Sequence, residues 1–277
     1  MKTKTAKIYI TLLTIVTIIA IIIGVSIHVG GIGFSSKVSN VSNTESFTGD
    51  LSDISLDLDA ADISIKYGDS IKVDYNMPEN NVPDISLDNG ELTIKDKPEK
   101  NRWIMFGFNS NPVRNVDITI PSNTNLDNLS IVTDAGKINL DGLTGKTAKI
   151  TSDAGDINFS NITLDSINIE SDAGKVNIDK SKLNNFVIDV DAGDVNVNDS
   201  EFNSFNIQAD AGDIGLSNST INSFTAESDA GNVEAEDCTI NGGSVKTDFG
   251  NIELNGDIKN VNTKTDVGNV KINGKSV

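Results

Sequence analysis

Apolar and polar residues alternate along short segments of this chain, and the alternation returns with a nineteen-residue period through its second half. When each repeat is counted from an Asp at position zero, apolar side chains occupy positions four and six, then eleven, fourteen and sixteen. A period of two predicts β-strands with one buried face, and the period of an amphipathic helix is not sustained anywhere in the repeats. Each repeat is therefore expected to contribute two strands of about five residues.

The tripeptide Asp-Ala-Gly begins six successive repeats, and two degenerate copies follow at residues 248–250 and 266–268. A sharp corner between strands needs a residue that adopts positive φ at low cost, which explains the Gly. The Asp before it can accept a hydrogen bond from a turn amide two residues further on. We assign a structural turn role to these positions, which are Asp134, Gly136, Asp153, Gly155, Asp172, Gly174, Asp191, Gly193, Asp210, Gly212, Asp229 and Gly231.

A fixed period of this length indicates a stacked repeat architecture, because two short strands cannot bury their own apolar faces. Equivalent strands are expected to pair in parallel, with Val176 beside Val195, and equivalent side chains to form columns such as Phe186, Phe205 and Phe224. All five prolines precede the first repeat, as expected if a continuous ladder excludes them. We predict an all-β fold, a parallel β-solenoid, and the alternative is a sandwich of short antiparallel strands.

Residues 8–29 contain no charged side chain and are long enough to span a bilayer as a helix. Lys2, Lys4 and Lys7 precede this run, so the positive-inside rule predicts a cytoplasmic segment 1–7 and an extracellular remainder. The competing interpretation is a cleaved signal peptide, whose apolar core is usually only about 7–15 residues long. We favour an uncleaved single-pass anchor in the cell membrane, with the lipid bilayer as its partner.

Beyond the anchor the composition predicts three further parts. Residues 30–44 are rich in Ser, Asn and Gly and are expected to form a flexible stalk. Residues 45–133 alternate irregularly and are expected to be the N-terminal part, or cap, of the solenoid that residues 134–277 continue. Within the cap, residues 59–63 (DAADI) resemble an imperfect copy of the repeat turn. A separate small β domain is the alternative for this region.

The chain carries 22 basic and 40 acidic residues, a net charge of −18, so no nucleic-acid partner is expected.

Stacked turn aspartates about 4.8 Å apart would repel one another unless hydrogen bonds or bound Ca²⁺ offset the repulsion. The residue after the turn Gly is Lys137 or Lys175 in two repeats, and a lysine cannot ligate calcium. These lysines are expected to neutralise the aspartate column, so we predict no cofactor, with structural calcium as the weaker alternative.

Residues suited to catalysis are scarce. The only histidine, His28, lies in the predicted anchor, and the single Cys238 can form no disulfide within the chain. A Ser-His-Asp site and a His or Cys zinc site are therefore unavailable outside the membrane. We predict no catalytic and no metal-binding residues and no enzyme activity. A carbohydrate-cleaving enzyme that works through two carboxylates is the weaker alternative.

One segment breaks the pattern. Residues 97–115 (KPEKNRWIMFGFNSNPVRN) contain the only tryptophan and several basic residues within an acidic chain. Such a loop could dock a partner or touch a membrane surface. The candidate partner-binding residues are Arg102, Trp103, Phe106 and Phe108. The alternative is that these rings cap the N-terminal end of the core.

Segments 116–121 (VDITIP) and 129–131 (LSI), the latter leading into Asp-Ala-Gly-Lys-Ile and the repeats, resemble the bacterial putative-adhesin family of β-strand-repeat domains, to which LiaG-like proteins belong. The resemblance covers residues 45–277, implies a cell-surface protein and supplies no catalytic residues. We therefore predict a membrane-anchored, non-enzymatic protein that binds or scaffolds an unknown component of the cell envelope or surface. The alternative is an envelope-stress accessory protein that acts on membrane proteins.

Overall fold

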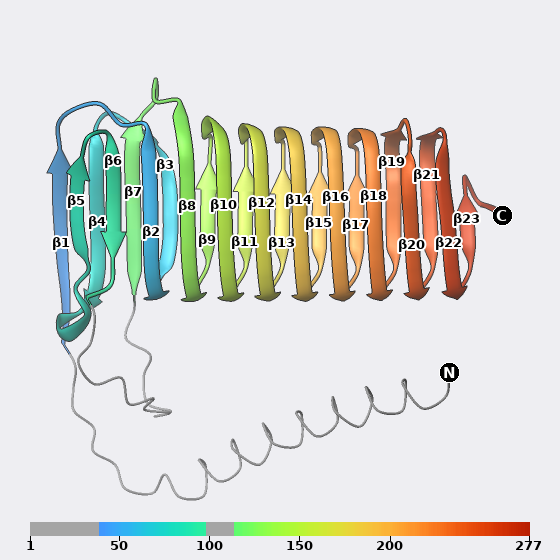
Figure 1. Ribbon diagram of the computed structural model, residues 1–277, viewed down its shortest axis with the longest axis horizontal. Coiled ribbons are helices and arrows are strands. Elements are labelled where there is room, and N and C mark those ends of the chain that lie inside the picture. Colours follow the sequence, from blue (N-terminus) through green and yellow to red (C-terminus); the bar gives the residue numbers. More distant parts are fainter. Residues whose placement is uncertain (1–38, 98–113) are drawn as a thin grey trace, which may run out of the picture. The chain divides into compact units, whose positions relative to one another are not determined.

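The computed structural model describes residues 39–97 and 114–277 (Figure 1). These residues form one compact all-β unit whose only helical element is the single 3₁₀ turn η1 (Glu79–Asn81). Within the described ranges, no helix has the length and hydropathy needed to cross a bilayer. The predicted anchor 8–29 and the predicted loop residues Arg102, Trp103, Phe106 and Phe108 lie outside these ranges.

Each repeat contributes one long and one short strand, and these build two walls. The long wall runs through β8 (Leu126–Ala135), β10 (Thr144–Ala154), β12 (Thr163–Ala173), β14 (Lys182–Ala192), β16 (Glu201–Ala211), β18 (Thr220–Ala230), β20 (Gly243–Phe249) and β22 (Val261–Val267). The short wall runs through β9 (Ile138–Asp141), β11 (Ile157–Ser160), β13 (Val176–Asp179), β15 (Val195–Asn198), β17 (Ile214–Ser217), β19 (Val233–Ile240), β21 (Ile252–Ile258) and β23 (Val270–Ile272). Figure 1 shows these strands succeeding one another along a single axis.

The parallel pairing between successive repeats is confirmed. Val176 pairs with Val195 between β13 and β15, and Phe186 pairs with Phe205 between β14 and β16, both in parallel. The alternative of an antiparallel sandwich is wrong for the repeats, because equivalent residues lie one rung apart throughout. The expected length of about five residues is close for the short wall, where β9 through β17 have 4 residues each. It was wrong for the long wall, where β10 through β18 have 11 residues each, because the strand continues through the Asp-Ala pair.

The stacking extends N-terminally beyond the regular repeats. Residues 59–63 do form a copy of the repeat turn, since Ala60 of β2 (Asp53–Ala60) pairs with Ala135 and Ile63 of β3 (Asp62–Gly68) pairs with Ile138. A further rung is added by β6 (Glu91–Lys95), parallel to β2, and β7 (Asn115–Pro121), parallel to β3. Between the rung of β2 and β3 and the rung of β8 and β9, a chain separation of 75 residues replaces the usual nineteen, because β4 through β7 are inserted there.

Antiparallel strands close the N-terminal end. On the long wall, β5 (Asp84–Asp88) pairs with β6, and on the short wall, β4 (Ile71–Pro78) pairs with β7 and with β1 (Asn40–Phe47). At the other end, the short strand β24 (Lys275–Ser276) folds back on β23. These antiparallel strands end the parallel stacking at three of the four wall ends.

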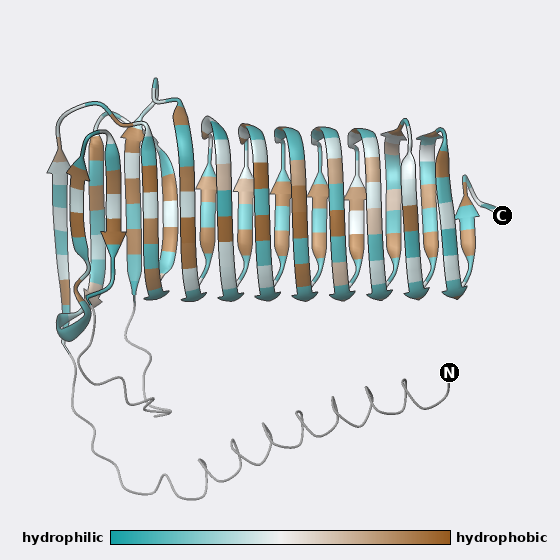
Figure 2. Cartoon of the chain, in the orientation of Figure 1, coloured by the Kyte–Doolittle hydropathy of each residue, from teal (hydrophilic) through white to brown (hydrophobic). Residues whose placement is uncertain are grey.

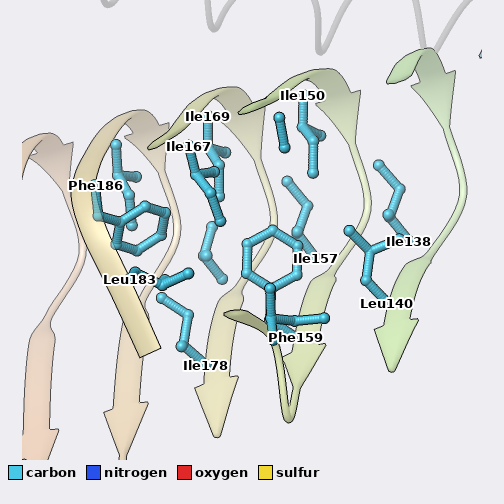
Figure 3. Packing of buried hydrophobic residues seen from close by; sticks show 14 of the residues in the cluster. Ile138, Leu140, Ile150, Ile157, Phe159, Ile167, Ile169, Ile178, Leu183 and Phe186 are labelled. Atoms are coloured by element: carbon cyan, nitrogen blue, oxygen red, sulfur yellow. The ribbon is translucent and has the colours of Figure 1, made fainter. Parts of the chain in front are cut away.

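The core lies between the two walls as columns of apolar side chains (Figures 2 and 3). The predicted phenylalanine column is confirmed: ring centroids are 5.1 Å apart for Phe186 and Phe205 and 5.8 Å apart for Phe205 and Phe224. Phe202 joins it from position eleven, with its centroid 4.5 Å from that of Phe205. Burial of each ring contributes about 2–3 kcal/mol.

The glycine corner has a second cause besides backbone conformation. Gly155 and Gly193 adopt positive φ, of 134° and 156°, as predicted. Gly231, however, lies outside that region, and a Cβ built on it would still overlap the carbonyl oxygen of Gly212 one rung below. Close approach of the backbone between rungs therefore excludes a side chain even where φ does not.

The hydrogen bonds at this corner differ from the expectation. The turn amides donate to the side chain at position three of the preceding rung: Lys175 N to Asp156 Oδ1 at 3.2 Å, and Asn232 N to Asp213 Oδ1 at 2.7 Å. The predicted lysine partners were also wrong, because Lys175 Nζ lies 2.8 Å from Oδ2 of Asp194, again at position three. The position-three column is thus bonded from rung to rung, while the leading aspartates face outward.

Candidate binding groove

The outer face of the short wall carries a ladder of asparagines at position five. Asn158 Nδ2 donates to Asn139 Oδ1 at 3.0 Å, Asn177 to Asn158 at 2.9 Å and Asn196 to Asn177 at 3.1 Å. The ladder arises because parallel strands in register place identical amides one interstrand spacing apart, about 4.8 Å. It ends at Gly215, whose missing side chain leaves a gap before Glu234 of the next rung.

A groove of about 480 Å³ lies over β13–β21 at this gap. Gly215 and the neighbouring strand residues form its floor, and amide and carboxylate side chains form its sides. The polar residues that line it are Asn177, Asp179, Asn196, Asn198, Ser217, Glu234, Glu236 and Glu253. A Cβ atom built on Gly215 would meet nothing closer than Asn196 Oδ1 at 3.5 Å. Packing therefore does not require a glycine at this position, and the gap exists only because the side chain is absent.

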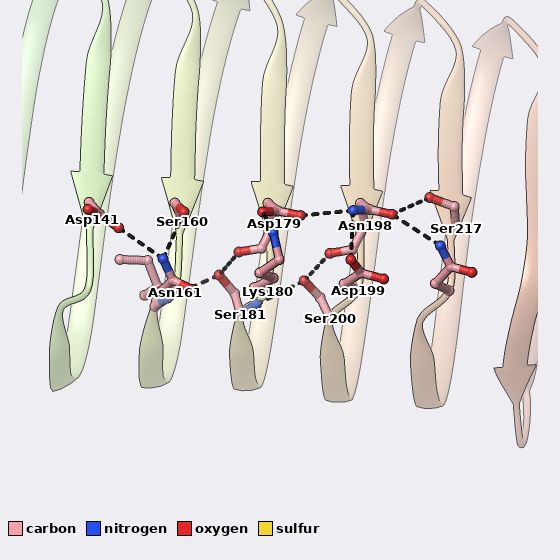
Figure 4. A network of polar contacts seen from close by, with 12 residues as sticks. Asp141, Ser160, Asn161, Asp179, Lys180, Ser181, Asn198, Asp199, Ser200 and Ser217 are labelled. Atoms are coloured by element: carbon pink, nitrogen blue, oxygen red, sulfur yellow. Dashed lines mark hydrogen bonds and ion pairs between the residues drawn. The ribbon is translucent and has the colours of Figure 1, made fainter.

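One side of the groove is a chain of hydrogen bonds at position seven (Figure 4). Asn198 Nδ2 donates to Asp179 Oδ1 at 2.8 Å, and Ser217 Oγ donates to Asn198 Oδ1 at 2.8 Å. The Lys180 ammonium, 2.9 Å away, and the Asn198 amide hold the pKa of Asp179 below its usual value. Asp179 is therefore ionised at neutral pH, and the hydrogen bonds already order this side of the groove.

The second corner keeps that chain in place. The residue at position eight takes the left-handed conformation in successive rungs, with φ of 56° at Asn161, 48° at Lys180 and 48° at Asp199. Beneath it lies a buried serine column at position nine, in which Ser181 N donates to Ser200 Oγ at 3.0 Å and Ser200 N donates to Ser219 Oγ at 3.1 Å. Cys238 occupies the same position, and its thiol donates to Glu236 O at 3.3 Å.

The other end of the groove is acidic. Glu234, Glu236 and Glu253 line it, Asn255 Nδ2 donates to Glu236 Oε2 at 3.0 Å, and Lys271 Nζ lies 4.0 Å from Glu253 Oε2. The groove thus presents carboxylate and amide oxygens as acceptors, together with amide donors. Such a lining suits a ligand that brings several hydrogen-bond donors, such as hydroxyl or ammonium groups.

The predicted turn aspartates form an exposed row along the first corner, apart from this groove. Partial burial, followed by the neighbouring Asp210 and Asp248 carboxylates, raises the pKa of Asp229 above its usual value. The contribution of these two carboxylates has the sign expected for repulsion along the aspartate column. No cluster of three potential metal-ligating side chains occurs among the described residues.

The two ends of the predicted partner-binding loop meet the first corner. Asp62 N donates to Arg114 O at 2.8 Å, and Asp96 N donates to Asp57 O at 3.0 Å. The chain thus leaves β6 and enters β7 beside the corner at which the regular repeats have their Asp-Ala-Gly turn. Sequence reasoning missed the groove, although one signal was present: Gly215 ends a run of four asparagines at position five and is followed one repeat later by Glu234.

Comparison with known proteins gives a family and a fold. A family model described as Toastrack DUF4097 matches residues 51–238. The crystal structure of a putative adhesin from Bacteroides fragilis NCTC 9343 is similar at 18% identity over 87% of this chain and 100% of that one, with a TM-score of 0.53. A putative adhesin from Parabacteroides distasonis ATCC 8503 matches at 15% identity over 85% and 97%, with a TM-score of 0.45. No curated protein matches the chain.

Proposed function

This chain belongs to the Toastrack DUF4097 family, and we propose that it is a non-enzymatic binding or scaffolding protein of the bacterial cell envelope. In this proposal residues 8–29 anchor it in the cell membrane, and the solenoid lies outside the cell. The Bacteroides fragilis protein of similar fold is described as a putative adhesin, which supports a surface-binding role. The net charge of −18 favours partners that are neutral or basic.

The observation that carries the proposal is the groove at Gly215. Its sides are held by side-chain ladders whose amides and carboxylates already bond one another, so ligand binding would not have to order them. The strands repeat about every 4.8 Å, which places equivalent acceptors at regular intervals along the groove. We propose a hydroxyl-rich envelope glycan as the ligand, held by the Asn196, Asn198 and Glu234 side chains.

Filling the groove tests this directly. A Cβ atom at residue 215 would be in ordinary contact with Asn196, so Gly215→Asn is expected to extend the asparagine ladder into the gap. The full chain in detergent micelles is titrated with envelope glycan fractions, and the variant is expected to bind at least about tenfold more weakly at an unchanged melting temperature. Asn139→Ala, at the far end of the same ladder, is the matched control and should bind normally. Equal binding by Gly215→Asn would contradict the groove as the site.

The anchored topology is tested by labelling whole cells. A single cysteine placed at Ser276, in a Cys238→Ser background, should react with a membrane-impermeant maleimide on intact cells, whereas one at Thr3 should react only after permeabilisation. Release of the protein into the medium without residues 1–29 would favour the signal-peptide alternative instead.

A second candidate function rests on where the chain enters the solenoid. The predicted stalk 30–44 is wrong at its C-terminal end, because strand β1 already begins at Asn40 and pairs with β4. Asn40 donates through Nδ2 to Asn76 Oδ1 at 3.0 Å, and Asn76 pairs with Asn115 at the exit of the 98–113 segment. The entry point and this exit are therefore two strands apart, about 10 Å. We propose on this basis that residues 98–113 act on membrane proteins, which is the accessory role.

This second candidate predicts a specific loss of contacts. Replacing Trp103 and Phe106 with Ser in the full chain should abolish crosslinks to membrane proteins in whole cells while leaving the melting temperature nearly unchanged. A large fall in melting temperature would instead favour the alternative that these rings cap the core.

A further inference from the structure

The long wall ends in a strand with an unused edge. β22 pairs with β20, and no strand covers its other side among the residues that the structure describes. The other three wall ends finish in antiparallel strands, namely β1, β5 and β24. Half of the backbone amides and carbonyls of a seven-residue edge strand such as β22 are free to pair with another chain.

The side chains beside this edge change character. Position one is Ala in every rung from Ala60 to Ala230, but in the last two rungs it is Phe249 and Val267, which pair with each other between β20 and β22. These side chains are 64% and 59% exposed. Small residues suffice everywhere else on this corner, so the two large apolar groups add surface that only a partner would bury.

The net charge of the chain also changes at this C-terminal end of the solenoid. Residues 134–250 contain 21 acidic side chains and seven lysines, whereas residues 251–277 contain three acidic side chains and four lysines. Two copies of so acidic a protein repel each other along most of their surface, but this end is close to neutral. It is therefore the part of the described solenoid where a second copy can approach without a large electrostatic cost.

We propose that two copies of this chain associate through β22, pairing antiparallel about a twofold axis at Thr265. In this register Lys264 of each copy lies opposite Asp266 of the other, so that both cross-strand pairs join opposite charges. Val267 of each copy lies opposite Thr263 of the other, on the same face of the joined sheet. The long walls then continue across the axis, and the open edge and its apolar neighbours are covered.

The charges at the axis allow a test in which each variant controls the other. In Lys264→Asp every cross-strand pair joins two carboxylates, and in Asp266→Lys every pair joins two ammonium groups. Each variant alone is expected to be monomeric, and an equimolar mixture is expected to dimerise, because both pairs are complementary again. The measurement is the protein mass of the full chain in detergent micelles by light scattering, against twice the chain mass of 29.4 kDa for the unchanged protein.

Two further variants probe the edge itself. Phe249→Ala with Val267→Ala restores the residue that the other rungs carry, and should weaken dimerisation at least about tenfold without lowering the melting temperature. Thr265→Cys in a Cys238→Ser background should form a disulfide between copies on mild oxidation, since residues facing each other on an antiparallel axis are within disulfide reach. Asn206→Cys, on the outer face of β16 in the same background, is the matched control and should not crosslink.

Several results would overturn the proposal. A monomeric full chain at about 100 μM would do so, and so would a dimer that persists in both charge variants, which would point to the anchor as the contact. Failure of the mixed charge variants to associate, while both remain folded, would show that β22 does not pair in this register. None of these outcomes depends on whether the groove at Gly215 binds a glycan.

Discussion

A Cβ atom on Gly193 would occupy the same space as the carbonyl oxygen of Gly174, nineteen residues earlier and one rung below. The same overlap is found between Gly174 and Gly155 and between Gly212 and Gly193. The chain thus passes this corner with its backbone against the backbone of the previous rung. Because no side chain fits there, the glycine column sets how closely the repeats stack.

Gly193→Ala is therefore expected to destabilise the protein by about 2–4 kcal/mol, through overlap with Gly174 and through its positive φ. Gly215→Ala is the control, because a Cβ there is in ordinary contact and φ is not restricted to glycine. It should change stability by less than about 1 kcal/mol. Thermal unfolding followed by circular dichroism distinguishes the two, and equal losses would argue against backbone contact as the cause.

Phe205→Ala should strongly damage the aromatic stack, because Phe205 contacts the rings of Phe186, Phe202 and Phe224. We expect a loss of about 3–5 kcal/mol from the lost burial and the remaining cavity. Phe249→Ala removes an equal volume from an exposed position and should cost less than about 0.5 kcal/mol. Denaturant titration of both variants measures the difference.

Ser200→Ala should cost about 1–3 kcal/mol, because the buried hydroxyl accepts from Ser181 N at 3.0 Å and no replacement acceptor is present. Its hydroxyl also donates to Asn198 O at 2.7 Å, so the groove side would loosen as well. Ser200→Cys should be tolerated better, since Cys238 fills the equivalent position of the same column two rungs further along. Hydrogen exchange at the Ser181 amide reports the loss at this site: protection retained in Ser200→Ala would contradict it.

The pKa values of two aspartates at the first corner should be shifted in opposite directions from the usual value. The Lys175 ammonium, followed by the Asp213 amide, lowers the pKa of Asp194, and partial burial, followed by Asp210 and Asp248, raises the pKa of Asp229. Both carboxyls have values near 3.8 when unfolded. The stabilisation that Asp194 contributes is therefore present above pH 3.8 and is lost as pH falls through its lower folded pKa. The contribution of Asp229 has the opposite sign: the protein loses stability as pH rises from 3.8 through the higher folded pKa of Asp229.

Carboxyl titration by NMR checks this pair. Asp210→Asn should lower the pKa of Asp229, because it removes the larger of the two sources of repulsion from neighbouring turn aspartates, and should leave the pKa of Asp194 unchanged. A folded pKa for Asp229 at or below that of Asp194 would contradict the assignment.

The repeat itself was predictable from the sequence. The alternation at positions four and six, repeated every nineteen residues, fixed which side chains face the core and which residues pair between rungs, as Val176 with Val195 shows. A one-residue slip would turn every apolar side chain outward, so the register has no competing solution. The imperfect turn at residues 59–63 was recognisable for the same reason, because its spacing of Asp59 and Ile63 repeats that of Asp134 and Ile138.

The contacts between neighbouring rungs were decided by the tertiary structure alone. The sequence indicated an Asp and a Gly at each corner, but not that Asp156 would accept from the amide of Lys175 or that Gly155 would meet a carbonyl oxygen. These contacts join residues nineteen positions apart, and they depend on the strand spacing, which no local pattern contains. The groove at Gly215 has the same origin, because a missing side chain becomes a gap only when its neighbours are stacked on both sides.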